Sequence, residues 1–291
     1  MKRCLQCASR FATDSWECPH CHLSPQVDGG LLVFAPDLAR AIEGYEPALF
    51  EAHGGEQAER SFWTGARAAL IIWALNHYAT QAGRFLEIGC GTGGVLARVE
   101  LALPDLSLVG GEALIAGLRV AQTRLLRTQL MQFDARSIPF DGEFDAVGAF
   151  DVIEHIPDDD KVLASMAGAL RPRGILLVTV PQHPFLFGPA DVAARHVRRY
   201  TTSGLVQQVQ RLGLRVECAT SFTSVLFPVM AAVRLLAKWR GGPYDSAEEF
   251  EIGPLNGLFA RIMDLERWTI RHGMRWPVGG SLMLVARKSP A

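Results

Sequence analysis

Short apolar runs and stretches of helical periodicity alternate along most of the chain. The runs have the length and the Gly, Pro or Asp boundaries of strands that are buried on both faces. The stretches between them place apolar side chains three or four residues apart, as the buried face of a helix requires. This alternation predicts an α/β fold with a parallel sheet. We expect seven strands, near residues 84–88, 107–111, 130–133, 145–150, 175–180, 214–219 and 281–286.

Helical stretches precede and separate these strands. The first of them ends at Gly83, directly before the first strand. A long insertion, residues 220–280, separates the last two strands and holds two helical stretches, which predicts a helical cap. The expected helices span residues 61–80, 113–127, 159–170, 222–239 and 255–272.

The first strand runs into a glycine-rich turn in which Gly89, Gly91 and Gly93 alternate with other residues, and helical spacing follows. Such a turn lets a ligand approach backbone N–H groups without a Cβ in the way. Glu87 lies two residues before the first glycine, where a carboxylate can accept from a ligand ammonium. The spacing differs from the pyrophosphate-binding pattern, which argues against NAD(P), the alternative cofactor. The stretch resembles the first motif of class I S-adenosylmethionine (SAM) dependent methyltransferases.

This resemblance assigns roles to side chains at the ends of further strands. Ligands of open α/β sheets bind across the carboxyl ends of the strands. Glu112, with Ala113 beside it, would accept from the ribose hydroxyls. Asp134, with Ala135 beside it, would accept from the adenine amino group. Phe150 would offer its backbone to the methionine moiety.

The resemblance extends over roughly residues 60–220 and is carried by segments 90–93, 144–147 and 170–176 as well. It implies a doubly wound, Rossmann-like sheet of seven strands, with the last strand antiparallel beside the fifth. It implies SAM as the cofactor but names no substrate. Arg67, on the preceding helix, could close over the cofactor carboxylate.

Candidate catalytic groups follow the fourth strand. Methyl transfer to a hydroxyl or amine needs an aligned nucleophile and a nearby general base. Glu154 and His155 would lie above the cofactor, and they resemble the Glu-His pair that binds a divalent ion in ubiquinone-type O-methyltransferases. That family's upstream glutamate is matched here only by Asp151. The pair therefore predicts a base or a Mg²⁺ site, and a loop brace is the alternative.

A second group of candidates follows the fifth strand, in residues 195–201. This segment resembles a His-x-Arg-Arg-Tyr stretch of bacterial small-molecule and glycolipid-associated methyltransferases. Its basic groups could bind a phosphate or carboxylate on the acceptor, or pair with the acids at 158–160. We take His196 and Tyr200 as candidates on the substrate side.

Four cysteines form two short hooks, Cys4-x2-Cys7 and Cys18-x2-Cys21. Two such hooks can supply four thiolates to a structural Zn²⁺. Two disulfides or four free thiols are the alternatives, and the lack of an export signal favours zinc. The expected divisions are a zinc-ribbon-like module (1–24), a linker and N-terminal helices (25–83), the SAM-binding core (84–219), the cap (220–280), and the last strand with a tail (281–291).

Composition limits the cellular context. The net charge of −1 gives no general attraction to nucleic acid. The N-terminus lacks an apolar segment of the secretory type, and no uncharged run is long enough for a spanning helix. We expect a cytoplasmic protein, with a membrane-peripheral one as the alternative. Residues 222–239 are apolar nearly all round, which is typical of a buried helix or of an interfacial one.

These features predict a SAM-dependent methyltransferase acting at oxygen on a small or lipid-linked acceptor. Some ribosomal-RNA methyltransferases also place a zinc module before a class I domain, so RNA is the alternative acceptor. A local basic face for RNA could come from Arg119, Arg124, Arg127 and the 195–199 cluster. A third possibility is a SAM-binding protein without catalytic activity.

Overall fold

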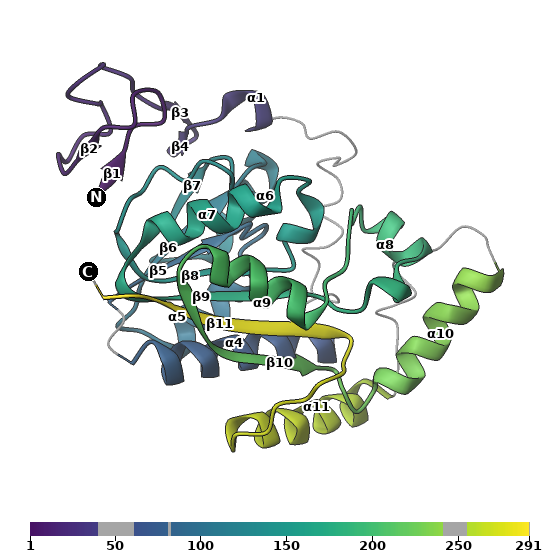
Figure 1. Ribbon diagram of the computed structural model, residues 1–291. Coiled ribbons are helices and arrows are strands. Elements are labelled where there is room, and N and C mark those ends of the chain that lie inside the picture. The colour runs from purple at the N-terminus through teal and green to yellow at the C-terminus, as the bar shows by residue number, and fades with distance from the viewer. Residues whose placement is uncertain (40–60, 81–82, 241–254, 291) are drawn as a thin grey trace.

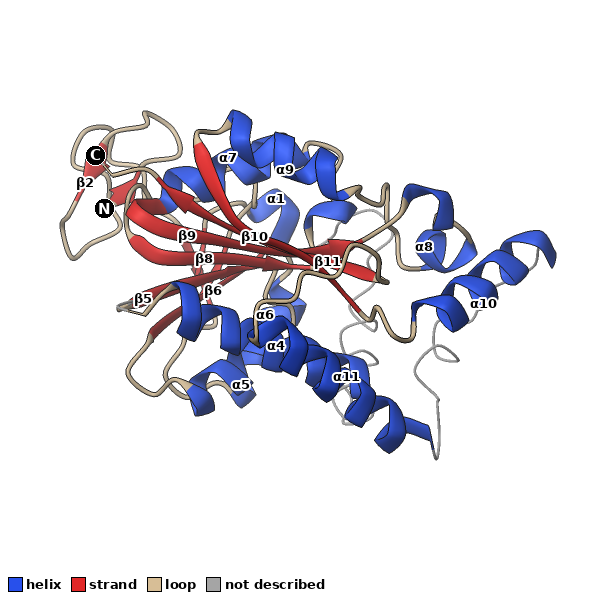
Figure 2. Ribbon diagram, turned by 60° about the horizontal axis from the view of Figure 1, so that its bottom comes forward, coloured by secondary structure: helices blue, strands red, loops and turns tan. Residues whose placement is uncertain are grey.

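The computed structural model describes residues 1–39, 61–80, 83–240 and 255–290. A nine-stranded sheet crosses the molecule and carries helices on both faces (Figures 1 and 2). The strands of the chain are β1 (Lys2–Arg3), β2 (Arg10–Phe11), β3 (Gln26–Asp28), β4 (Leu31–Val33), β5 (Arg84–Ile88), β6 (Ser107–Glu112), β7 (Gln129–Gln132), β8 (Phe144–Phe150), β9 (Leu170–Pro181), β10 (Leu214–Phe222) and β11 (Ser281–Lys288), of which β1 and β2 pair with each other outside the large sheet. The α-helices are α1 (Pro36–Ala39), α4 (Phe62–Tyr78), α5 (Gly94–Ala102), α6 (Ile115–Arg124), α7 (Asp159–Ala169), α8 (Pro189–Ala193), α9 (Thr202–Arg211), α10 (Phe227–Arg240) and α11 (Asn256–Arg271). Two short 3₁₀ helices are η1 (Ile153–His155) and η2 (Pro184–Leu186).

The strand order is β10-β11-β9-β8-β5-β6-β7-β4-β3. All seven predicted strands are present. The last strand, β11, lies antiparallel beside β9, the fifth, with Leu282 opposite Val180, which confirms the arrangement that the resemblance implied. From β5 the chain proceeds to β6 and β7 on one side and later to β8 and β9 on the other. The strand order thus reverses at β5, where ligands of open α/β sheets bind.

The sheet has two strands more than predicted. Residues 25–30 were expected to be a linker, but β3 and β4 form a hairpin there, and β4 extends the sheet beside β7. Gly29 and Gly30 connect the two strands with φ values of 57° and 81°. A two-residue turn with both φ angles positive suits glycine and matches the twist of a hairpin. The structure thus has a hairpin within the segment that was expected to include a linker.

Two apolar layers hold the helices to the sheet. Successive strand residues point to opposite faces, so Phe85 enters one layer and Leu86 the other. Helices α4, α5, α6 and α11 cover the first face, and α7 and α9 cover the second (Figure 2). Burial on both faces explains why the strands read as continuous apolar runs.

The N-terminal segment is packed against the rest of the chain. The Trp16 ring lies edge-on to Phe34 and Phe140, with centroid distances of 4.9 and 5.4 Å. The Arg3 N–H donates to the Pro139 carbonyl at 3.0 Å. The segment is therefore anchored to the sheet edge and to the loop before β8.

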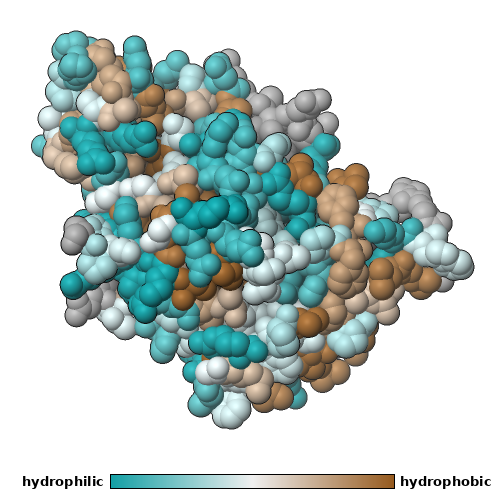
Figure 3. Space-filling model, in the orientation of Figure 1, coloured by the Kyte–Doolittle hydropathy of each residue, from teal (hydrophilic) through white to brown (hydrophobic). Residues whose placement is uncertain are grey.

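Both helical stretches predicted between the last two strands are present, as α10 and α11, and residues 241–254 lie outside the described part of the chain. Helix α11 packs along α4, whereas α10 projects from the end of β10 beside α8 (Figure 1). Apolar atoms gather on the surface where α10 lies (Figure 3). No helix in the described residues combines the length and apolar character needed to cross a bilayer.

We predict that Gly111→Ala destabilises the fold. A Cβ at Gly111 in β6 would overlap the Phe133 ring, and such overpacking typically costs about 1–3 kcal/mol. Urea unfolding should show this loss. Gly168→Ala is the matched control, because a Cβ there meets no atom within 4 Å and alanine favours the helix. Equal stability of the two variants would contradict the close packing of Phe133 on β6.

Candidate active site

The glycine turn between β5 and α5 adopts a backbone conformation that requires glycine. Gly89, Gly91 and Gly93 have φ values of 67°, 52° and 79°. A Cβ at Gly89 would lie 2.5 Å from Cγ2 of Val152, whereas a Cβ at Gly91 would meet nothing within 4 Å. The turn is thus packed tightly at its first glycine and open at its second, where a ligand can approach the backbone.

Glu112, at the end of β6, holds the turn in place. Its Oε2 accepts from the Gly91 N–H at 2.9 Å. Its Oε1 accepts from the N–H groups of Ala113 and Leu114 at 2.8 and 3.1 Å. Burial raises the pKa of Glu112, and these three hydrogen bonds oppose the rise. The carboxylate therefore has a fixed orientation beside the glycine turn.

Glu87, at the end of β5, is buried and incompletely paired. Its exposed fraction is 3%, and its Oε2 has no hydrogen-bond partner among the described residues. Burial raises the pKa of Glu87 to about 8, against the opposing charge of Arg67. Leaving a buried carboxyl oxygen unpaired is costly, so the site favours a ligand that donates or carries positive charge.

Arg67 reaches the same edge of the sheet from α4. Its guanidinium pairs with Asp151 and lies 4.3 Å from the centre of the Trp63 ring. Thr179 also donates to Asp151, at 3.2 Å. Asp151 is thus engaged by Arg67 and Thr179, and a contact between Arg67 and a cofactor carboxylate stays a prediction.

The remaining predicted cofactor residues lie at the ends of β7 and β8. Asp134 accepts from Arg136 Nε at 2.9 and 3.0 Å, so its carboxylate is paired within its own loop. Ala135 packs against the second apolar layer. Phe150 is buried, with its ring 6.4 Å from that of Phe85. The adenine contact of Asp134 and the methionine contact of Phe150 stay predictions.

A second group of charged side chains surrounds Asp191 of α8, which is fully buried. His196 Nδ1 lies 2.9 Å from Asp191 Oδ1, and Arg199 Nε donates to the same oxygen at 2.7 Å. Burial alone would raise the pKa of Asp191, but hydrogen bonds from His196 and Arg199 hold it below its ordinary value. Asp191 was not among the predicted site residues, although it lies five positions before His196.

Glu154 and His155 lie next to this group. Glu154 is fully buried, neither of its carboxyl oxygens has a hydrogen-bond partner among the described residues, and burial raises its pKa well above the ordinary value. His196 Nε2 lies 3.9 Å from Glu154 Oε1. The rings of His155 and His196 meet edge-to-face at 4.7 Å, and burial together with His196 lowers the pKa of His155 to about 4. The structure thus brings Glu154, His155 and His196 together.

These three residues do not suit Mg²⁺. Their ligand atoms lie within 4.8 Å of one another, which would allow a shared ion. They supply two imidazole nitrogens and one carboxylate, whereas Mg²⁺ prefers oxygen ligands in octahedral geometry. The expected magnesium site therefore has no support in the donor set.

Tyr200 is hydrogen-bonded to a different carboxylate. Its hydroxyl donates to Asp159 Oδ2 at 2.7 Å, and Arg198 pairs with the same carboxylate. Burial and this hydrogen bond raise the pKa of Tyr200. These contacts brace the 195–201 segment against α7, so the substrate-side role predicted for Tyr200 has no geometric support. Arg198 instead follows the predicted alternative, because it pairs with one of the acids at 158–160.

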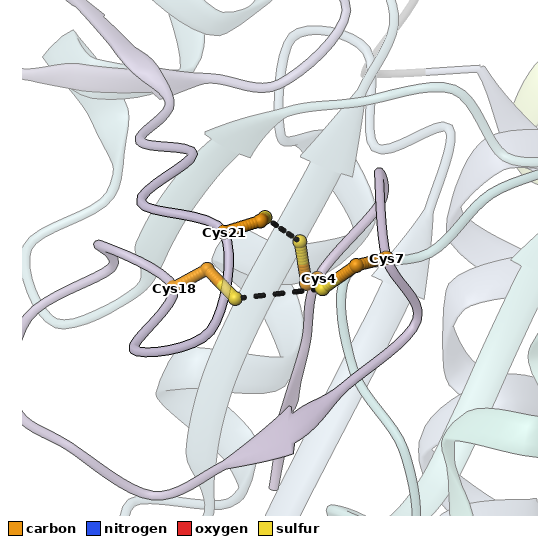
Figure 4. A group of neighbouring side chains, drawn as sticks. All are labelled: Cys4, Cys7, Cys18 and Cys21. Carbon is orange, nitrogen blue, oxygen red and sulfur yellow. Dashed lines mark hydrogen bonds between the residues drawn. The ribbon is translucent and has the colours of Figure 1, made fainter.

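The four N-terminal cysteines converge on one point (Figure 4). All four thiols are free, with Sγ distances of 3.4 Å between Cys4 and Cys21 and 3.7 Å between Cys7 and Cys18. A disulfide would need about 2.0 Å. Thiolates on a tetrahedral zinc, at Zn–S distances of about 2.3 Å, lie about 3.8 Å apart. The cluster therefore has the donor set and spacing of a zinc site.

Solved structures similar to this chain share its fold. A putative sarcosine dimethylglycine methyltransferase from Galdieria sulphuraria is 18% identical with a TM-score of 0.52, and the match covers 78% of this chain and 86% of that one. A cyclase, SpnF, is 22% identical with a TM-score of 0.50, over 76% and 80% of the two chains. At this identity the likeness concerns the fold alone.

The relatives similar in sequence each match less than half of the chain. A ubiquinone biosynthesis O-methyltransferase from Albidiferax ferrireducens is 31% identical over 132 residues, which is 42% of this chain and 52% of that protein. The corresponding protein of Acinetobacter baylyi is 27% identical over 143 residues, or 46% and 59%. The chain thus spans about half the length of these relatives. The family model described as a methyltransferase domain matches residues 63–219, which is more than half of the chain. The chain therefore belongs to the methyltransferase-domain family.

Proposed function

We propose that the protein transfers a methyl group from SAM to an oxygen atom of a small or lipid-linked acceptor. The observation that carries this proposal is the buried, unpaired carboxyl oxygen of Glu87 beside the glycine turn. The fold alone would not suffice, because one protein of similar fold is named as a cyclase.

The described residues fit SAM. The cofactor carries an ammonium group, and Glu87 offers that group a carboxyl oxygen that lacks a partner. The open backbone at Gly91 leaves room beside Glu112, whose fixed carboxylate suits the ribose hydroxyls. Bound SAM supplies a methyl group activated by its sulfonium.

His196 is the proposed general base. The pKa of Asp191 is held below its ordinary value, and its carboxylate accepts a hydrogen bond from Nδ1–H of His196. This leaves the Nε2 lone pair free to take a proton. His196 Nε2 would accept the proton of the acceptor hydroxyl as that oxygen takes the methyl group from the cofactor sulfur. Burial raises the pKa of Glu154, and its Oε1 lies 3.9 Å from this nitrogen, which is beyond hydrogen-bond distance. Asp191 acts as a positioning residue.

The choice of oxygen and of a small or lipid-linked acceptor rests on the relatives. Those cited are named for O-methylation in ubiquinone biosynthesis. RNA has less support, because arginines of the predicted basic face are engaged within the protein. Arg119 pairs with Asp28, and Arg127 donates to the backbone carbonyls of Glu100 and Pro104.

We also propose that the cysteine cluster holds one structural Zn²⁺. The support is the convergence of four free thiols in a segment too small to build a core without metal. Metal analysis of the purified protein should find about one zinc per chain. Cys18→Ser should lose most of it, and the control Cys218→Ser, outside the cluster, should keep it. Full zinc content in Cys18→Ser would refute the site.

Calorimetry should detect SAM binding that depends on Glu87. Replacing a charged hydrogen-bond partner removes about 1.5–3 kcal/mol, so Glu87→Gln should weaken binding about tenfold or more. Gly89→Arg, which fills the turn, should abolish binding. Asp105→Asn changes an exposed acid outside the site and should leave the affinity unchanged. Absence of binding in the folded wild type would overturn the proposed function.

The affinity for SAM, measured in the same way, should depend on pH. The pKa of Glu87 is about 8 in the free protein, so below pH 8 the group is mostly protonated and a cationic ligand must displace its proton. Affinity should therefore rise as the pH increases toward 8. SAM's own ammonium titrates in this range too, so the comparison is between wild type and Glu87→Gln at each pH. The affinity ratio should grow with pH, and a constant ratio would contradict the titration of Glu87.

His196→Gln should lower kcat by about 10²–10⁴, the usual contribution of a general base. Transfer of labelled methyl groups to candidate acceptors measures kcat, and calorimetry should show unchanged SAM affinity. Tyr200→Phe is the control, because that hydroxyl is engaged by Asp159, and its turnover should stay near the wild-type value. Equal losses in both variants would argue that the 195–201 segment is needed only for structure.

A further inference from the structure

Helix α10 exposes an almost wholly apolar face. Among residues 227–239, the part of the helix whose side chains the structure describes, Lys238 is the only exposed residue with a charge. Trp239 is 82% exposed and Val229 65%. The exposed apolar positions run along the helix from its first turn to its last described residue: Pro228, Val229, Ala232, Val233, Leu235, Leu236 and Trp239.

The polarity of α10 is the reverse of that of an ordinary surface helix. Arg234 points toward the protein, with its guanidinium 3.5 Å from buried Asp191. Lys238 reaches back to the Phe185 carbonyl at 3.4 Å. Helix α11 is the internal comparison, since its exposed positions mix Arg261 and Asp264 with apolar residues. A surface helix in water normally turns its apolar side inward, so the outward face of α10 fits a non-aqueous environment.

Neighbouring elements extend this apolar face toward the candidate active site. Phe185 of η2 and Val192 of α8 are 56% and 64% exposed, and both elements contact α10. Val192 directly follows Asp191, which positions His196. The surface formed by α10, Phe185 and Val192, called here the α10 face, therefore borders the acceptor side of the proposed site.

The charge pattern selects the partner. The chain has no Asp or Glu from Cys218 to Tyr244, and the last turn of α10 holds two basic residues, Lys238 and Arg240, besides Arg234, which is engaged by Asp191. An apolar helix face that ends in Trp and basic residues is typical of helices that lie in the headgroup region of anionic membranes. Partner-protein interfaces normally carry a polar rim, which the exposed positions of α10 lack.

We propose that the α10 face docks the protein on the surface of an anionic phospholipid bilayer. Fourteen residues make a helix about 21 Å long, too short for a hydrocarbon core of about 30 Å, so α10 would lie along the surface. Docking presents the site at the level where the head of a lipid-linked acceptor lies. This last step rests on the proposed function, whereas docking itself does not.

Vesicle co-sedimentation of the full-length protein tests this proposal. Phosphatidylcholine vesicles are compared with vesicles of equimolar phosphatidylcholine and phosphatidylglycerol. We expect binding to the anionic vesicles at least about tenfold tighter, weakening as salt is added. The triple variant Val229→Ser, Val233→Ser, Leu236→Ser should lose about tenfold or more of this affinity.

The matched control changes α11. Leu258→Ser, Leu265→Ser, Trp268→Ser alters residues of similar exposure and should keep vesicle affinity within about twofold. Circular dichroism should confirm that both variants are folded. Failure of the wild type to bind anionic vesicles, or equal losses in the two variants, would overturn the proposal. A dimer in light scattering that only the α10 variant dissociates, without vesicle binding, would instead assign the face to a second copy.

The measurement separates this proposal from the proposed function, because vesicle binding needs neither SAM nor turnover. SAM calorimetry on the α10 variant should give the wild-type affinity. Vesicle binding without SAM binding would support the docking proposal and refute the proposed methyltransferase function. SAM binding without vesicle binding would do the reverse.

Discussion

The hydrogen bond from the Gly91 N–H to the Glu112 carboxylate is the contact on which the rest of the site depends. It joins the turn after β5 to the end of β6, so the left-handed backbone of the turn is fixed by a side chain from the neighbouring strand. The turn also sets where α5 begins, and it directly follows the strand that carries Glu87. The strand order reverses at β5, so the connections on its two sides run in opposite directions. In the described part of the chain, no crossover therefore covers the carboxyl end of β5.

The pKa values of three buried carboxyl groups in the candidate site shift in different directions because their surroundings differ. Glu87 and Glu154 are buried without sufficient partners, so their pKa values are raised. Asp191 is equally buried, yet Arg199 and His196 keep its pKa low. Glu87 therefore favours a cationic ligand, burial shifts Glu154 toward its protonated form, and Asp191 orients an imidazole. Such separation of similar groups is typical of sites that handle charge and protons.

The sequence predicted those features that depend on neighbours along the chain. The strands were recognisable because burial on both faces makes them continuously apolar, and the glycine turn because its signal lies within five residues. The hairpin at Gly29 and Gly30 was missed although two glycines between apolar residues are a hairpin signal, because the two residues were interpreted as part of a linker. Contacts such as Tyr200 with Asp159, or Arg234 with Asp191, join distant segments, and residue spacing cannot reveal them.

The contact between Arg234 and Asp191 also explains why α10 can keep an apolar face outward. A basic residue within an apolar helix must find a partner, and here the partner is the acid that positions His196. With Arg234 engaged by Asp191, Lys238 is the one charged group that residues 227–239 of the helix expose to water. The contact between Arg234 and Asp191 thus links the charges around His196 to the apolar surface of α10 next to them. A change that released Arg234 would disturb the positioning of His196 and the orientation of α10 together.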